Sequence, residues 1–178
     1  REINLGFFSR MVRGTPWAEA PVLLVSAHSG EGIDALKAAL RELAARAHRE
    51  ADARHAFFLP LQRSFAVAGA GTVATGVTAS GTVKPGDELE LLPAGKRSRV
   101  RRVQVHGREA PVGQAGLRTA LNLPDLHPED CVRGTVLVAP GSASVGDLAR
   151  VVVRLLPEAP PLEHAATVQV LAHTAAVA

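Results

Sequence analysis

The stretch LPLQRSFAVAGAGTVATGVTASGTVKPGDELELLP, from Leu59 to Pro93, decides the fold class. Apolar residues alternate with polar or small ones, glycines recur at short intervals, and VKPGD is a turn signal. A period of two between turn residues is typical of antiparallel strands. Several short strands at this spacing predict a small sandwich or barrel, so we expect a mostly β protein. The strand candidates are Phe65–Val67, Val73–Thr78, Glu88–Leu92, Val100–Val105, Thr119–Leu123 and Val136–Ala139.

Within this stretch, GAGTVA at Gly69–Ala74 matches the glycine fingerprint of dinucleotide-binding folds. That fingerprint requires a helix directly after it. The sequence that follows is β-branched and is interrupted by Gly76 and Gly81, which disfavours a helix. We therefore interpret these glycines as residues of tight β-turns or bulges.

A different pattern precedes the β-rich region. Val22–Val25 is short and apolar, as expected of a buried parallel strand, and the loop SAHSGEG follows it. From Ile33 to Ala47 apolar residues recur at helical spacing, and Asp34 lies in the first turn, which suits the helix dipole. Together these segments predict one βα unit of a larger sheet.

After the β-rich region, GSASVG near Gly141 has the composition of a connection. Arg150–Leu156 and Thr167–Leu171 are then predicted to be the first strands of another β domain.

Composition and charge exclude several classes of protein. The chain has 178 residues, is 47% hydrophobic and carries a net charge of +3. Residues 57–140 hold ten Lys and Arg against seven Asp and Glu, so the positive excess lies in the β-rich region and allows an acidic partner. Cys131 is the single cysteine, which excludes an intrachain disulfide and fits a reducing cytoplasm. No apolar run approaches the ~20 residues that cross a membrane, so we expect a cytoplasmic protein without a membrane partner.

The sequence offers no support for a catalytic or metal centre. GSASVG differs from a nucleophile elbow because Ser142 stands where that motif has glycine. The seven histidines never pair at metal-ligand spacing, and one cysteine cannot supply a thiolate cluster. We therefore expect no catalytic residue and no metal ligand, and we expect function to lie in binding surfaces.

Basic residues are the candidates for such surfaces. KRSRVRR is the densest basic run, and it either faces water on a hairpin or contacts RNA phosphates in a salt-dependent way. Arg63 and Arg118 each stand beside an apolar strand, where arginines are commonly surface residues that lie over a barrel. The possible RNA contacts in the basic run are Lys96, Arg97, Arg99 and Arg101.

The motifs AGAGTVATGVTASGTVKPGDELELLP, RVRRVQVHG, AGLRTALNL and RGTVLV resemble, in order and spacing, the second domain of translational GTPases of the selenocysteine-specific branch. GTPWAEAPVLLVSAHSGEGIDALKAAL is similar to the end of that family's GTPase domain, and RLLPEAPPLEHAATVQVLAHTAAV to the start of its third domain. The resemblance implies a small translation-factor β-barrel flanked by the last βα unit of a P-loop GTPase domain and the first strands of a second β-barrel. The implied domains are residues 1–56, 57–141 and 142–178.

The resemblance also implies a function. The chain would be a fragment of a factor that delivers selenocysteyl-tRNA to the ribosome in a GTP-dependent manner, with the barrel binding the aminoacyl end. Arg63 and Arg118 match two arginines of the family's aminoacyl pocket, and Gln62 stands where the family has an aspartate. Two guanidinium groups would favour a selenol anion over a neutral seryl hydroxyl.

In the loop SAHSGEG, the resemblance assigns the guanine of GTP to Ser26, Ala27 and His28. The backbone N–H of Ala27 would donate to the guanine 6-oxo group, and the Ser26 hydroxyl would stabilise the loop. However, the chain contains no G-x-x-x-x-G-K-[ST] phosphate loop and no N-K-x-D motif. We therefore expect GTP and Mg²⁺ to bind the intact parent protein but not to bind this chain tightly, and the chain alone should not hydrolyse GTP.

Two alternatives remain open at this point. The first is another tRNA-carrying GTPase, of the elongation factor Tu or initiation-factor gamma type. The second is a stand-alone β-barrel interaction module with no role in tRNA binding.

Overall fold

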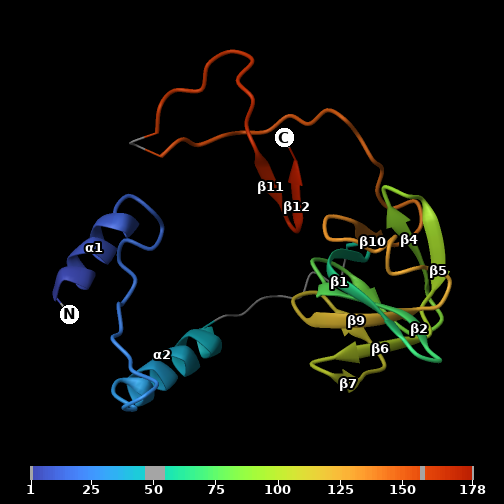
Figure 1. The fold of residues 1–178 in the computed structure, drawn as a ribbon, viewed down its shortest axis with the longest axis horizontal. Coiled ribbons are helices and arrows are strands. Elements are labelled where there is room, and N and C mark those ends of the chain that lie inside the picture. The colour runs from blue at the N-terminus through green and yellow to red at the C-terminus, as the bar shows by residue number, and fades with distance from the viewer. Residues whose placement is uncertain (1, 47–54, 157–158, 178) are drawn as a thin grey trace. The chain divides into compact units, whose positions relative to one another are not determined.

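The computed structural model describes residues 2–46, 55–156 and 159–177. The chain divides into two compact units, residues 1–48 with 151–164 and residues 49–150 with 165–178. Within the described residues the first unit contains the helices and the second contains the strands (Figure 1).

The first unit has two helices, α1 (Glu2–Val12) and α2 (Ile33–Arg46). The helix expected from Ile33 to Ala47 is therefore confirmed to residue 46, whereas α1 was not expected. An acidic residue in the first turn of α2 and Arg46 in its last turn both suit the helix dipole.

The prediction of a strand at Val22–Val25 is wrong. These four residues form no strand, and they are between 39% and 49% exposed. An extended segment becomes a strand only when its backbone groups pair with a neighbour, and the described part of the first unit contains no strand to pair with.

An antiparallel sheet of eight strands forms the second unit, which confirms the mostly β class. Two small two-stranded sheets accompany it, β3 (Thr82–Val83) with β8 (Gly113–Gln114) and the hairpin of β11 (Val170–Ala172) with β12 (Ala175–Val177). The main sheet runs, in spatial order, through β5 (Lys96–Arg99), β4 (Glu88–Leu92), β10 (Val136–Val138), β1 (Phe58–Val67), β2 (Gly71–Val77), β9 (Arg118–Leu123), β6 (Arg102–Val105) and β7 (Arg108–Glu109).

The sheet curls into a barrel-like shape because of a two-residue connection. β5 and β6 lie towards opposite ends of the sheet, yet only Val100 and Arg101 separate them along the chain. The Val100 N–H donates to the Asp87 carbonyl over 2.8 Å, and the Arg101 N–H donates to the Asn122 carbonyl over 2.9 Å. Consecutive residues thus hydrogen-bond to the two ends of the sheet, which must approach one another (Figure 1).

Alternate residues of the strands fill the interior of this sheet, as the period of two predicts. The buried Thr78 and Thr119 hydroxyls hydrogen-bond to each other over 3.0 Å, so neither polar group is left unpaired in the core. The largest side chains with less than 2% exposure are aliphatic: Leu59, Leu61, Leu89, Leu91, Leu121, Leu123 and Leu137.

The longest strand, β1, pairs with two neighbours in turn. Phe58–Pro60 pairs with β10 and Leu61–Val67 pairs with β2, with a register shift between Leu61 and Arg63. The extra residue at this irregularity is Gln62, and bulges of this kind bend a strand and redirect a side chain.

The glycines of GAGTVA lie in turns, as interpreted from the sequence. The turn between β1 and β2 contains Gly69, with φ of 73°, and β2 begins at Gly71, with φ of 86°. A Cβ on Gly71 would lie 3.2 Å from the Cα of Pro124. Glycine therefore suits position 71 both for its positive φ and for its close packing against Pro124.

The predictions for the C-terminal region are partly wrong. Arg150–Leu156 forms no strand, and of Thr167–Leu171 only the last two residues enter β11. The β11–β12 hairpin packs on the main sheet of its own unit: the Arg133 Nε donates to the Thr174 carbonyl over 3.2 Å, and the rings of Phe58 and His173 are 5.5 Å apart. The expected domain boundaries at residues 56 and 141 stay predictions.

Replacing Gly76 with alanine should destabilise the second unit. An added Cβ would lie 2.2 Å from the Pro60 carbonyl oxygen, so the backbone of β1 beside the bulge would have to shift. We expect a loss of roughly 1–3 kcal/mol in the free energy of unfolding, measured by urea denaturation. The matched control is Gly146→Ala, where nothing lies within 4 Å. Equal stabilities of the two variants would contradict the close approach.

Candidate functional site

The outward faces of β1, β2, β9 and β6 form one continuous surface. The register aligns Phe65, Val73, Asn122 and Arg102 in one cross-strand row, and cross-strand neighbours point to the same side of a sheet. The next row contains Arg63, Thr75, Ala120 and Gln104, and beyond it Val77 pairs with Arg118. These outward positions include three arginines and no aspartate or glutamate.

Gln62 and Arg118 meet on this surface, although they are 56 residues apart in the sequence. The Arg118 Nη1 donates to the Gln62 Oε1 over 2.8 Å. Gln62 is half-buried at the bulge, whereas Arg118 is exposed at the start of β9. The structure therefore brings together two of the three residues that the sequence nominated for an aminoacyl pocket.

The third nominated residue, Arg63, lies on the same surface and is exposed. Within residues 2–46, 55–156 and 159–177 its side chain makes no hydrogen bond or ion pair. Its place, one row from Arg118 across β2, leaves its guanidinium available to a ligand on this face.

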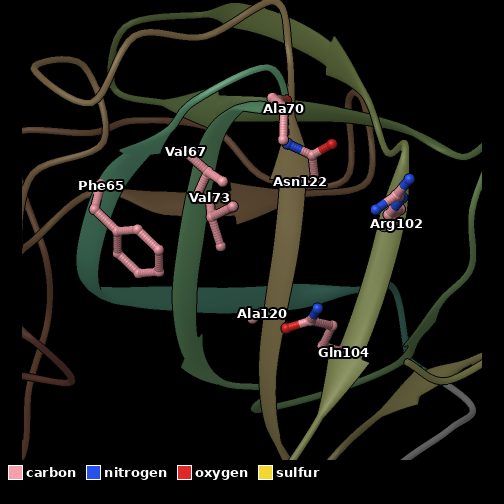
Figure 2. A pocket seen from close by; sticks show the side chains of 8 residues that line it. All are labelled: Phe65, Val67, Ala70, Val73, Arg102, Gln104, Ala120 and Asn122. Carbon is pink, nitrogen blue, oxygen red and sulfur yellow. Dashed lines mark hydrogen bonds between the residues drawn. The ribbon is translucent and has the colours of Figure 1, made fainter. Parts of the chain in front are cut away.

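An apolar pocket of about 180 Å³ lies on the same surface, and Arg102 is among the residues that line it (Figure 2). One wall is hydrophobic, and Phe65 in it is 48% exposed. Asn122, which is 6% exposed, donates its amide to the carbonyls of Ala70 and Thr72 over 2.7 and 3.1 Å. Its Oδ1 is buried and has no hydrogen-bond partner among the described residues. The pocket is lined by Phe65, Val67, Ala70, Val73, Arg102, Gln104, Ala120 and Asn122.

Sequence reasoning missed this pocket. The sequence feature that could have indicated the pocket is the period of two in SFAVA, which places Phe65 and Val67 on one face of the strand. Large apolar side chains on the outward face of a barrel strand indicate a contact surface, since the inward face already fills the core.

The loop SAHSGEG is ordered by its own hydrogen bonds. The Ser26 Oγ accepts from the Ser29 N–H over 3.2 Å, and the Ser26 N–H donates to the Glu31 carbonyl over 2.9 Å. The backbone of Gly32 packs closely against Leu24, because a Cβ at position 32 would lie 2.1 Å from the Leu24 carbonyl oxygen. Within the described part of the chain, the N–H groups of Ala27 and His28 donate to no acceptor, and both residues are exposed.

The basic run KRSRVRR is partly neutralised by carboxylates. Lys96 Nζ lies 2.7 Å from the Asp130 Oδ1, and Arg97 Nη1 lies 3.8 Å from the Glu88 Oε2. Arg99 and Arg101 are exposed, and neither makes an ion pair in the part of the chain that the structure describes. Their contact with RNA stays a prediction.

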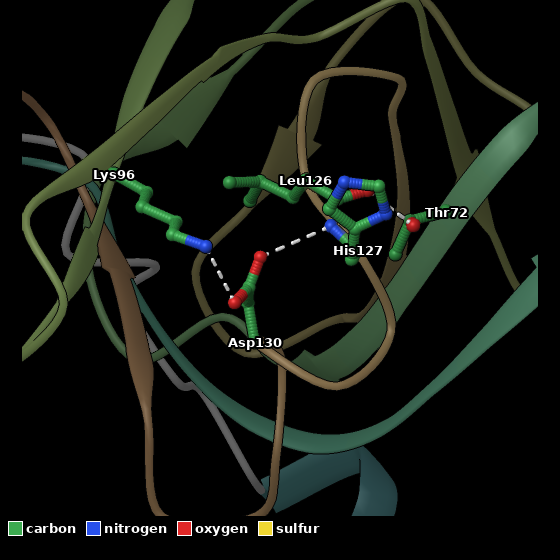
Figure 3. Close-up of polar contacts among 5 residues, drawn as sticks. All are labelled: Thr72, Lys96, Leu126, His127 and Asp130. Atoms are coloured by element: carbon green, nitrogen blue, oxygen red, sulfur yellow. Dashed lines mark hydrogen bonds and ion pairs between the residues drawn. The ribbon is translucent and has the colours of Figure 1, made fainter.

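The loop after β9 hydrogen-bonds both to Lys96 of β5 and to Thr72 of β2 (Figure 3). Asp130 accepts from Lys96 and from the His127 N–H, the latter over 3.2 Å, and Thr72 donates to the Leu126 carbonyl. The Lys96 ammonium and the His127 N–H lower the pKa of Asp130 below its usual value. Burial raises the pKa of the neighbouring Cys131 to about 11, so its thiol is protonated and unsuited to nucleophilic chemistry at neutral pH.

Two kinds of feature are absent from the described residues. No cluster of three or more His, Cys, Asp or Glu side chains could bind a metal ion there. None of the helices within these residues has the length and apolar character that a membrane crossing requires.

Comparison with known proteins identifies the class of domain. Residues 71–138 match the family model "Elongation factor Tu domain 2". The antiparallel barrel-like sheet and this match define the region as a second domain of the elongation factor Tu type.

The wider chain is a homologue of selenocysteine-specific elongation factors, which confirms the resemblance found in the motifs. It is 41% identical to the selenocysteine-specific elongation factor of Desulfomicrobium baculatum over 82% of this chain and 23% of that protein. Identity to the factor of Escherichia coli K12 is 38% over 72% of this chain and 21% of that protein. The chain thus spans about a quarter or less of these relatives.

Solved structures agree with the sequence relatives. A crystal structure of a bacterial selenocysteine-specific elongation factor, EF-Sec, superposes with a TM-score of 0.65 at 31% identity, covering 78% of this chain and 23% of that one. Elongation factor SelB of Methanococcus maripaludis, crystallised with the GTP analogue GppNHp, gives a TM-score of 0.70 at 27% identity, over 78% of this chain and 31% of that one.

Stability should depend on pH through Asp130. Its pKa in the folded protein lies below that of the unfolded chain, so its ion pair stabilises the fold fully above the unfolded pKa of about 3.9 and is lost as pH falls through the folded pKa. We therefore expect Asp130→Asn to lower the urea midpoint at pH 7 and to match the wild type in strong acid. The control is Glu129→Gln, an exposed neighbour. A difference that persists unchanged below pH 2 would contradict the ion-pair explanation.

Proposed function

We propose that this chain is part of a selenocysteine-specific elongation factor, which carries selenocysteyl-tRNA to the ribosome in a GTP-dependent manner. The observation that carries the proposal is the contact between Gln62 and Arg118, on the face of β1, β2, β9 and β6 whose outward positions hold no acidic side chain and which also holds an apolar pocket. The homology to selenocysteine-specific factors supports the same substrate.

The chemistry of the aminoacyl group suits this surface. A selenol is more acidic than a thiol, so it is an anion at neutral pH, whereas a serine hydroxyl is neutral. Charge-assisted hydrogen bonds from Arg63 and Arg118 to that anion would each contribute about 1.5–3 kcal/mol. A seryl group cannot supply the charge and would leave the guanidinium groups poorly paired.

The apolar pocket suits the terminal nucleoside of the same tRNA. Exposed Phe65 and Val67 offer a surface for a nucleobase, and stacking on an aromatic ring contributes about 1–3 kcal/mol. A tRNA end bound there would place its aminoacyl ester on the same face as the two arginines.

The loop SAHSGEG suits the guanine of GTP. The free N–H groups of Ala27 and His28 are donors for the 6-oxo group, and the hydrogen bonds of Ser26 keep the loop ordered. GTP would reach this loop only together with phosphate- and Mg²⁺-binding groups, whose motifs this sequence does not contain. Contacts of Arg99 and Arg101 with RNA backbone, on tRNA or ribosome, are part of the same proposal.

Replacing Arg118 with alanine should reduce discrimination between the two aminoacyl-tRNAs. We expect selenocysteyl-tRNA to bind the intact factor, loaded with a GTP analogue, about tenfold or more weakly, with seryl-tRNA changed little, because only the anion uses the lost charge. Dissociation constants for both tRNAs measure this effect. The control, Arg108→Ala, removes an exposed arginine on β7. Equal losses for both tRNAs would refute the assignment.

Replacing Phe65 with alanine should weaken the binding of both tRNAs rather than reduce the discrimination between them. The nucleoside is common to both tRNAs, so we expect both dissociation constants to rise by a similar factor, about fivefold or more. Val112→Ala, which removes an exposed apolar side chain away from the pocket, is the control. A loss confined to one of the tRNAs would place Phe65 at the aminoacyl group instead.

A further inference from the structure

The β11–β12 hairpin is attached to the barrel by local contacts rather than by strand pairing. Within the described residues, neither of its strands joins the main sheet. The connection from β10 to the hairpin contains no helix or strand in residues 139–156 and 159–169. Each strand of the hairpin has three residues, and Val170 and Leu171 are 47% and 76% exposed. An isolated two-stranded hairpin is at best marginally stable in water, so this one depends on its contacts with the barrel.

Those contacts involve the turn of the hairpin. His173 and Thr174 connect the two strands, since Ala172 pairs with Ala175. The ring centroid of His173 lies 5.5 Å from that of Phe58, the half-buried first residue of β1, with the rings tilted by 47°. The Arg133 Nε donates to the Thr174 carbonyl over 3.2 Å. Residues on two sides of β10 in the sequence therefore hold the hairpin by its turn.

The backbone of this turn is unfavourable for the residue that occupies it. His173 has a φ of 52°, in the left-handed region where a side chain is strained and glycine is preferred. A second histidine, His106, has the same φ in the turn between β6 and β7. The His106 ring contacts no other aromatic ring in the part of the chain that the structure describes. The contact with Phe58 therefore distinguishes His173 from a histidine in an otherwise similar strained position.

We propose that the β11–β12 hairpin is a latch and that His173 is the residue that closes it. A strained conformation persists only where its surroundings stabilise it, and here the ring contact with Phe58 outweighs the strain at His173. The hairpin has a docked and a released state, and because few contacts separate them, the loss of one contact shifts the balance. Release also returns the Arg133 Nε–H to water. The latch goes beyond the proposed function, since it requires neither tRNA nor GTP.

Hydrogen–deuterium exchange of backbone amides, followed by NMR on the chain of residues 1–178, tests the latch. In an ordinary turn, His173→Gly would relieve the strain and slow exchange in the hairpin. We expect the opposite: hairpin amides should exchange about threefold or more faster, whereas core amides of β9 and β10 stay within about twofold. The Arg133 Nε–Hε signal should also exchange faster with water. The matched control is His106→Gly, the same change at the same φ, which should leave the hairpin unaffected.

A second variant tests the other side of the contact. Phe58→Leu removes the ring and keeps an apolar side chain at the start of β1, so we expect hairpin exchange to accelerate as it does in His173→Gly. Combining the two substitutions should add little, because each removes the same contact. Unchanged or slower hairpin exchange in His173→Gly would overturn the proposal. Fully additive effects of the two substitutions would overturn it as well, because His173 and Phe58 would then act independently.

Discussion

Two neighbouring N–H groups, those of Val100 and Arg101, determine the shape of the β domain. The first donates to Asp87 beside β4 and the second to Asn122 in β9, so two consecutive residues connect opposite ends of the sheet. The sheet must curl to allow this, and the curl encloses the aliphatic core. It also turns the outward faces of β1, β2, β9 and β6 into one surface, on which the candidate site lies.

The site itself depends on a local irregularity. Without the register shift between Leu61 and Arg63, strict alternation would send Gln62 and Arg63 to opposite faces of β1. The bulge adds one residue, and Gln62 then reaches Arg118 across the glycine of β2 that pairs with Leu61. The candidate site therefore lies at a tightly packed part of the sheet. Gly76 approaches the Pro60 carbonyl oxygen so closely that a Cβ at position 76 would not fit.

Individual residues show how far prediction from sequence reached. Arg63 and Arg118 could be nominated from motifs, and both lie on the predicted surface. The motifs also grouped Gln62 with these two arginines, but the hydrogen bond from Arg118 to Gln62 could not be predicted, because a contact across 56 residues depends on register and curl. Lys96 was nominated for RNA, yet it pairs with Asp130, 34 residues away. Val22–Val25 was expected to be a strand, but an apolar run becomes a strand only beside a partner.

The sequence by itself determined the features that obey local rules: the mostly β class, helix α2, the turn glycines and the family resemblance. Periodicity and backbone preference act over a few residues, so they can be recognised in a single chain. Only the tertiary structure decided which distant side chains meet. The apolar pocket beside Asn122, the neutral contact that positions Arg118 and the carboxylates that engage the basic run all depend on strand order and register, which no local pattern encodes.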